Sequence, residues 1–227
     1  MRYCLAICLI SALLAACVPA VVPVTPPPVP SQPSAAFTPV PTLVPPSATS
    51  TPQPPAGIVV LDFISLLCNA QWSNGAKHLT ACTPVNADHS GGFADSVDPT
   101  QEGLPAGTPV LLTIPAWNGA SSLFLRYPSL VVSPGDRFQA TLLCRKTLPC
   151  DVQFALEYYD ASGKYHSPFM EWNFLSGDAP IRVDADLSAL AGQAVDLVLV
   201  LRLFHALDTF ERDNGLWIQP QVFRPGR

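Results

Sequence analysis

The heptapeptide VQFALEY, residues 152–158, decides the fold, because apolar and polar side chains alternate along it. Alternation with a period of two places the apolar side chains on one face of a β-strand. A turn follows in DASG at 160–163, and IRVDA at 181–185 alternates again. These segments predict a sheet whose strands are half-buried.

More β-like segments lie on both sides of this heptapeptide. Residues 195–204 form a dense apolar run, which is typical of a strand covered on both faces. Further short strands are predicted at 112–114, 131–132, 138–144, 216–218 and 221–223. Roughly eight short strands separated by turns, with no internal repeat, predict an all-β fold built as a two-sheet β-sandwich.

One short helix, or a helical turn, is predicted before the strands. Asp62 is a good N-cap, and Asn74-Gly75 is a good stop. Between them, apolar residues recur at helical spacing at Phe63, Leu66, Leu67 and Ala70. Residues 82–109 are rich in Asp, Gly, Ser and Pro, which predicts a long surface loop.

The first 16 residues have the parts of an export signal: Arg2, a short apolar run and small residues at the end. The apolar stretch at 3–16 is too short for a spanning helix, which needs about 20 residues. The tetrapeptide LAAC at 14–17 resembles the lipobox of bacterial lipoproteins. That resemblance implies a lipid on the sulfur of Cys17 and an extracytoplasmic chain held on a membrane of the bacterial cell envelope.

A proline-rich linker is predicted after Cys17. Residues 18–56 carry 14 of the 26 prolines and no charged side chain. Proline fixes φ and removes an amide donor, so neither helix nor sheet can persist there. We therefore expect a signal peptide at 1–16, a lipidated cysteine with a disordered linker at 17–56, and one β-sandwich domain at 57–227.

Four cysteines remain in the predicted domain, and disulfides are expected in an exported protein. Four cysteines allow three pairings. We favour Cys68 with Cys82 and Cys144 with Cys150, because each pair is local and closes a short loop. A zinc site is the alternative, but the spacings differ from those of paired C-x-x-C knuckles.

Four segments resemble the galactose-binding-like jelly-roll superfamily: SPGDRF at 133–138, VDADLS at 183–188, LAGQ at 190–193 and LWIQP at 216–220. The pentapeptide CNAQW at 68–72 is similar to a stretch in uncharacterised exported bacterial lipoproteins. The first resemblance implies a jelly-roll sandwich, and many members of that superfamily bind carbohydrate through loops at one end. These motifs are structural, and no set of binding residues transfers from the superfamily to this chain.

Aromatic side chains in or beside predicted loops are the candidate ligand platform, because aromatic rings stack on the apolar faces of sugars. The candidates are Trp117, Tyr127, Tyr165 and Trp172. The alternative for each of them is packing in the core. Core positions are predicted for Trp72, close to a disulfide, and for Trp217, within a strand.

A structural calcium site built from carboxylates is an open alternative, which the jelly-roll resemblance makes plausible. The residues concerned are Asp184, Asp186, Asp196, Asp208 and Asp213. No D-x-D-x-D-G loop is present, and no cofactor is expected. A hydrolytic carboxylate pair is a further alternative, which sequence alone does not test.

Function is predicted by exclusion as much as by motif. The net charge is −5 and no basic block occurs, which argues against a nucleic-acid partner. No H-E-x-x-H or G-x-S-x-G motif occurs, so we expect no enzyme. The prediction is a membrane-anchored, non-catalytic binding module for glycans; the alternatives are a structural or adaptor protein that contacts an envelope protein, and then a small hydrolase.

Overall fold

The computed structural model describes residues 56–82, 90–116, 121–145, 150–204 and 214–226. The chain divides into two units, 1–51 and 52–227, and the described residues all belong to the second. The predicted signal peptide, Cys17 and nearly all of the predicted linker lie outside the described residues. Among the residues described, no helix is long and apolar enough to cross a membrane.

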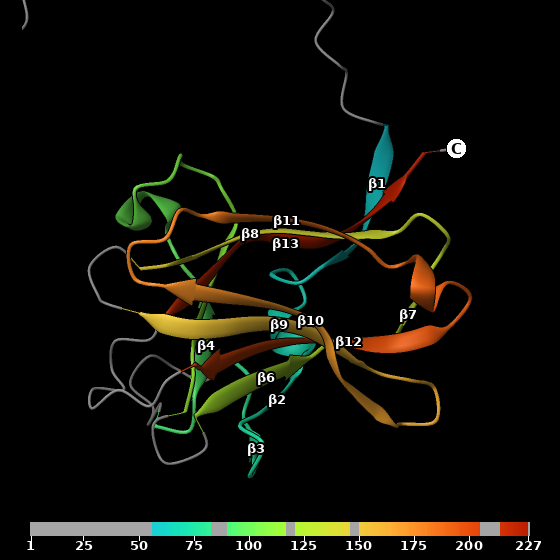
Figure 1. Cartoon of the computed structure of the whole chain (residues 1–227), viewed down its shortest axis with the longest axis horizontal. Coiled ribbons are helices and arrows are strands. Elements are labelled where there is room, and N and C mark those ends of the chain that lie inside the picture. Colours follow the sequence, from blue (N-terminus) through green and yellow to red (C-terminus); the bar gives the residue numbers. More distant parts are fainter. Residues whose placement is uncertain (1–55, 83–89, 117–120, 146–149, 205–213, 227) are drawn as a thin grey trace, which may run out of the picture. The chain divides into compact units, whose positions relative to one another are not determined.

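Two antiparallel sheets form the two layers of a sandwich (Figure 1), which confirms the predicted all-β fold class. The first sheet has the strand order β11-β8-β13-β5-β4, and β1 also pairs with β13. Its strands are β1 (Gly57–Asp62), β4 (Phe93–Ser96), β5 (Val110–Ile114), β8 (Arg137–Cys144), β11 (Ile181–Asp186) and β13 (Gly215–Pro225).

The second sheet has the order β10-β9-β12-β6-β2-β3, and β7 also pairs with β12. Its strands are β2 (Gln71–Ser73), β3 (His78–Leu79), β6 (Ser122–Arg126), β7 (Leu130–Val131), β9 (Asp151–Tyr159), β10 (Tyr165–Leu175) and β12 (Ala194–Leu203). This sheet carries the candidate site described below.

Alternating side chains of both sheets fill the space between the layers. Phe154 and Leu156 of β9 point into this core, as the alternation in VQFALEY predicts. Trp217 of β13 is fully buried, and its ring meets Phe154 edge to face at a centroid distance of 4.9 Å. Its indole N–H donates to Thr113 Oγ1 at 3.1 Å, so the buried polar atom is satisfied. The predicted core position of Trp217 is confirmed.

The prediction of a short helix before the strands is wrong, and the alternative of a helical turn is confirmed. Only Leu67–Asn69 forms a 3₁₀ turn, η1, and the described residues contain no α-helix. The segment crosses from β1 in one sheet to β2 in the other, and its apolar side chains enter the core along this crossing. Trp72 lies in β2, is 2% exposed and donates its indole N–H to the Leu67 carbonyl at 3.1 Å, so its predicted burial is confirmed.

The predicted long loop at 82–109 is also partly wrong. Phe93–Ser96 forms β4, which pairs with β5. Its residues Phe93 and Ala94 are buried. Pro99–Glu102 forms a second 3₁₀ turn, η2, and Asp98 caps it by accepting the Thr100 N–H at 2.9 Å. Residues 216–218 and 221–223 form one strand, β13, with a register irregularity between Ile218 and Gln221.

The segments that resemble the jelly-roll superfamily are structural corners. Asp136, fully buried at the SPGD turn, accepts the Ser133 N–H at 2.8 Å and two hydrogen bonds from Arg224 at 2.7 and 2.8 Å. Burial would raise the pKa of Asp136, but these hydrogen bonds outweigh it and hold that pKa below its usual value. Asp186 accepts the Ser188 N–H at 2.9 Å at the start of a third 3₁₀ turn, η3 (Ser188–Leu190).

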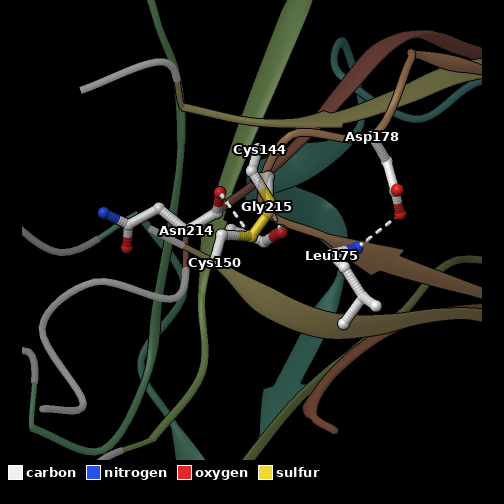
Figure 2. Close-up of a disulfide and its surroundings, with 7 residues drawn as sticks. Cys144, Cys150, Leu175, Asp178, Asn214 and Gly215 are labelled. Carbon is white, nitrogen blue, oxygen red and sulfur yellow. Dashed lines mark hydrogen bonds between the residues drawn. A yellow bond between two sulfur atoms is a disulfide. The ribbon is translucent and has the colours of Figure 1, made fainter. Parts of the chain in front are cut away.

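Both favoured disulfides are present, Cys68–Cys82 and Cys144–Cys150. Figure 2 shows the second one beside Asn214 and Gly215, and Gly215 is paired with Cys144 across β13 and β8. Disulfides persist in oxidising compartments, so this pair of bonds is a sign of an extracytoplasmic protein.

Candidate functional site

The outer face of the second sheet, which points away from the core, carries a second apolar cluster. Ala155 of β9 with Val198 and Val200 of β12 are buried there, and aromatic side chains pack against them. This explains the continuous apolar run at 195–204, since β12 is covered on both faces as predicted.

An open pocket of about 380 Å³ lies on this face. We call it the outer-face pocket. Its lining residues come from β2, β3, β6, β9, β10, β12 and the β2–β3 turn: Gln71, Ser73, Gly75, Ala76, Lys77, His78, Phe124, Arg126, Tyr159, Tyr165 and Val198. Strands far apart in the sequence thus combine aromatic, amide and basic side chains in one hollow.

The β2–β3 hairpin forms one wall of the pocket. Asn74 is buried, and its Oδ1 accepts the N–H groups of Ala76 and Lys77, both at 3.0 Å. Gly75 has a φ of 84°, which glycine adopts without strain. A Cβ at Gly75 would lie 3.4 Å from the ring of Phe124, so the hairpin tip lies directly beside that ring.

Aromatic and basic side chains build the floor. Arg126 of β6 donates from Nε to Asp196 Oδ2 at 2.8 Å, and its guanidinium lies 4.0 Å from the ring centroid of Tyr159. The rings of Tyr159 and Tyr165 are 4.8 Å apart and tilted by 30°. An ion pair and a cation–π contact therefore fix the position of Tyr159.

A buried carboxylate, Glu157, holds the lining residue Tyr165 in place. Glu157 of β9 is 0% exposed, although it lies on the outer face. It accepts hydrogen bonds from the phenol of Tyr165, from Ser167 Oγ at 2.6 Å and from Arg202 Nη2 at 2.5 Å. Arg202 also lies 3.8 Å from Glu171. This network anchors the ring of Tyr165 at the pocket and leaves the carboxylate no open side.

The sequence candidates divide between the pocket and the core. Tyr165 lines the pocket, but in strand β10 rather than in a loop. Trp172 points from the other face of β10 and stacks on Phe138 in the core at 6.1 Å. Trp117 lies outside the described residues.

The prediction that Tyr127 belongs to a surface platform for a ligand is wrong. Its side chain is 1% exposed and meets Phe63 edge to face at 4.7 Å. Burial, with a smaller contribution from Asp62, raises the pKa of its phenol far above the ordinary range. Its N–H donates to the Leu197 carbonyl at 2.9 Å, so the chain stays against β12 beyond β6 and carries the ring inward.

Tyr165 is the one described lining residue that the sequence analysis named as a ligand candidate; Phe124, Arg126 and Tyr159 are among those it missed. The signal was present, because Phe124 and Arg126 alternate with Leu123 and Leu125 in SLFLR. Tyr159 has the parity of Glu157, opposite to the core residues of VQFALEY. Once the core face is known, the alternation places all three on the outer face.

The described carboxylates among the calcium candidates bind other groups of the protein. Asp184 binds Arg137 at 2.6 Å, and Asp196 binds Arg126. Asp208 and Asp213 lie outside the described residues. In the part of the chain that the structure describes, no group of three or more His, Cys, Asp or Glu side chains could hold a metal ion.

Comparison with known proteins gives a distant likeness to a solved structure. No protein-family model matches the sequence, and no curated protein matches it. Among solved structures, the chain is similar to the Clostridium thermocellum N-terminal endo-1,4-beta-D-xylanase 10B, CBM22-1-GH10 modules complexed with xylohexaose. The identity is 11% and the TM-score 0.41, and the match covers 75% of this chain but only 28% of the xylanase chain. A likeness at this level leaves the function to be argued from the pocket itself.

Proposed function

We propose that this protein is a non-catalytic binding module that takes a glycan in the outer-face pocket. The observation that carries the proposal is the juxtaposition of Phe124, Tyr159 and Tyr165 with polar side chains in one open hollow. Its volume of about 380 Å³ falls within the range of small-molecule sites. That size suits one end or a short segment of a glycan.

The lining matches the two kinds of surface that a sugar presents. The C–H face of a pyranose ring is apolar and packs on aromatic rings, as other apolar groups do. Its hydroxyls need donors and acceptors, which the amide of Gln71 and the hydroxyl of Ser73 supply at the pocket wall. The fixed positions of Tyr159 and Tyr165 reduce the entropy lost on binding.

Binding fits the pocket better than hydrolysis does. A glycosidase needs two carboxyl groups that flank the scissile bond. The described lining residues include no carboxylate, and the two nearby carboxylates, Glu157 and Asp196, are already bound to arginines.

The first test is removal of an aromatic wall. We expect Phe124→Ala to weaken glycan binding at least about tenfold, because an aromatic side chain supplies a large share of the energy of a small site. The measurement is a glycan-array screen with the purified full-length chain, followed by calorimetric titration of the best ligand. Circular dichroism should show that the variant keeps the β fold.

Phe204→Ala is the matched control, because Phe204 is 42% exposed and does not line the pocket. It should bind as the parent does. Equal affinity of Phe124→Ala and the parent would contradict the proposal that the outer-face pocket is the site.

An adaptor function is the second candidate. Ile58 and Val131 are 62% and 61% exposed, and they flank Arg224. Ile58 pairs with Arg224 across β1 and β13, and Arg224 Nη2 donates to the Val131 carbonyl at 3.2 Å. Exposed apolar residues at one edge favour a protein contact, and silence across a broad glycan array would favour this function over the first.

We also propose that Cys17 carries a lipid that holds the module on a membrane, with the proline-rich segment as a stalk. The support is the lipobox-like LAAC after an export-type apolar run. Cys17→Ser should move the protein from the membrane fraction to the soluble fraction of the host cell. Cys8→Ser, within the same apolar run, is the control and should stay with the membrane. Unchanged fractionation of Cys17→Ser would disprove the anchor.

A further inference from the structure

We infer that the outer-face pocket selects a glycan that carries a carboxylate, that is, a uronic acid. This inference deepens the proposed function and rests on it. It begins with charge: the whole chain has a net charge of −5, yet the described lining of the pocket holds three basic residues and no acidic one. The three are Lys77, His78 and Arg126. A hollow lined by one sign of charge concentrates ligands of the opposite sign.

Lys77 carries the ammonium group of the three. It is exposed, and no described residue forms an ion pair with it. Arg126 is already bound to Asp196 through Nε and Nη2, which leaves Nη1 facing no described partner. An ammonium with no described ion-pair partner, in the same pocket as a guanidinium, suits a monoanion such as a carboxylate.

Hydrogen bonds within the hairpin fix the backbone of Lys77. The Asn74 side chain binds the Lys77 amide at 3.0 Å, and Asn74 N–H donates to the Lys77 carbonyl at 3.2 Å. Gly75, two residues before Lys77, lies against the ring of Phe124. A sugar ring packed on Phe124 is therefore next to the turn that carries the ammonium.

The stereochemistry of the sugar is left to the experiment, so the probes are paired. Oligogalacturonate, oligomannuronate and a glucuronate oligosaccharide are each titrated beside the carboxyl-reduced neutral form of the same glycan. Sulfated and phosphorylated oligosaccharides form two further arms. The protein is the purified full-length chain.

We expect at least one acidic glycan to bind about tenfold more tightly than its neutral form, since hydrogen bonds to charged groups are among the stronger ones. This preference should shrink as salt is added. Lys77→Gln should reduce the affinity for the acidic form by about the same factor, so that the preference over the neutral form is lost. Lys164→Gln, an exposed lysine outside the pocket lining, is the matched control and should change neither.

The outcomes separate this inference from the function on which it rests. Equal affinity for acidic and neutral forms, or an unchanged preference in Lys77→Gln, overturns the uronic acid assignment and leaves glycan binding in place. Binding only to the sulfated or phosphorylated arm overturns the assignment as well. Binding to no glycan of any kind overturns the proposed function, and this inference with it.

Discussion

Replacement of Arg202 by methionine is expected to lower the free energy of unfolding by about 3–5 kcal/mol, as the loss of one partner of a buried ion pair does. Arg202 Nη2 donates to Glu157 at 2.5 Å, and Glu157 is 0% exposed. Without the arginine, the carboxylate of Glu157 stays buried, and its remaining hydrogen-bond donors are the hydroxyls of Tyr165 and Ser167. The measurement is urea unfolding at neutral pH, followed by circular dichroism.

Two further variants serve as controls for this result. Arg182→Met removes an exposed arginine from the other sheet and should change stability by less than about 0.5 kcal/mol. The double variant Arg202→Met/Glu157→Gln should regain much of the loss, because a neutral amide needs no cation. Its oxygen can accept from one of the two hydroxyls, and its NH2 group can donate to the other. A loss below about 1 kcal/mol in Arg202→Met, or no recovery in the double variant, would show that the buried network does not stabilise this face.

The two-sheet sandwich was predictable because its central strands are long enough to display a period. Residues 152–158, 181–185 and 138–144 fall within β9, β11 and β8. In β9 the alternation also assigns Phe154 and Leu156 to the core and Ala155 and Glu157 to the outer face. The disulfides followed from proximity in sequence, since each pair lies 14 or 6 residues apart.

Strand β10 was not predictable in the same way, and this misplaced its aromatic residues. Its sequence YHSPFMEWNFL contains Pro168, and its pairing with β9 shifts register between His166 and Met170. The shift breaks the period of two, so Tyr165 and Trp172 read as loop residues although both lie in a strand. Strands β2 and β3 span only three and two residues, too few to show any period.

The pocket is a property of the strand order, which the sequence does not contain. Lys77, Phe124 and Tyr159 come from three separate segments of the chain. They meet because β12 pairs with β9 and β6, and β6 pairs with β2. Strand parity places each of them on a face, but only the sheet order places them beside one another.

Removal of the Cys68–Cys82 disulfide is expected to cost about 3 kcal/mol of unfolding free energy in the chain-entropy model and to weaken glycan binding more than tenfold. The bond joins the chain just before β2 to the chain just after β3, so it closes the base of the hairpin that forms the pocket wall. Trp72 of β2 anchors the first strand of this hairpin in the core, but β3 pairs with β2 over only two residues. A pairing this short is marginal by itself, so we expect the tip and the β3 side of the hairpin to depend on the disulfide.

Cys68→Ala/Cys82→Ala should therefore lose affinity for the best array ligand, measured by calorimetric titration at a temperature where the domain stays folded. Cys144→Ala/Cys150→Ala is the matched comparison: its bond joins β8 to the start of β9, and none of its residues lines the outer-face pocket. It should lose about 2 kcal/mol of stability in the same model and keep its affinity. Equal affinity losses in the two variants would mean that binding follows global stability, and no loss in the first would mean that the β2–β3 hairpin holds its position without the bond.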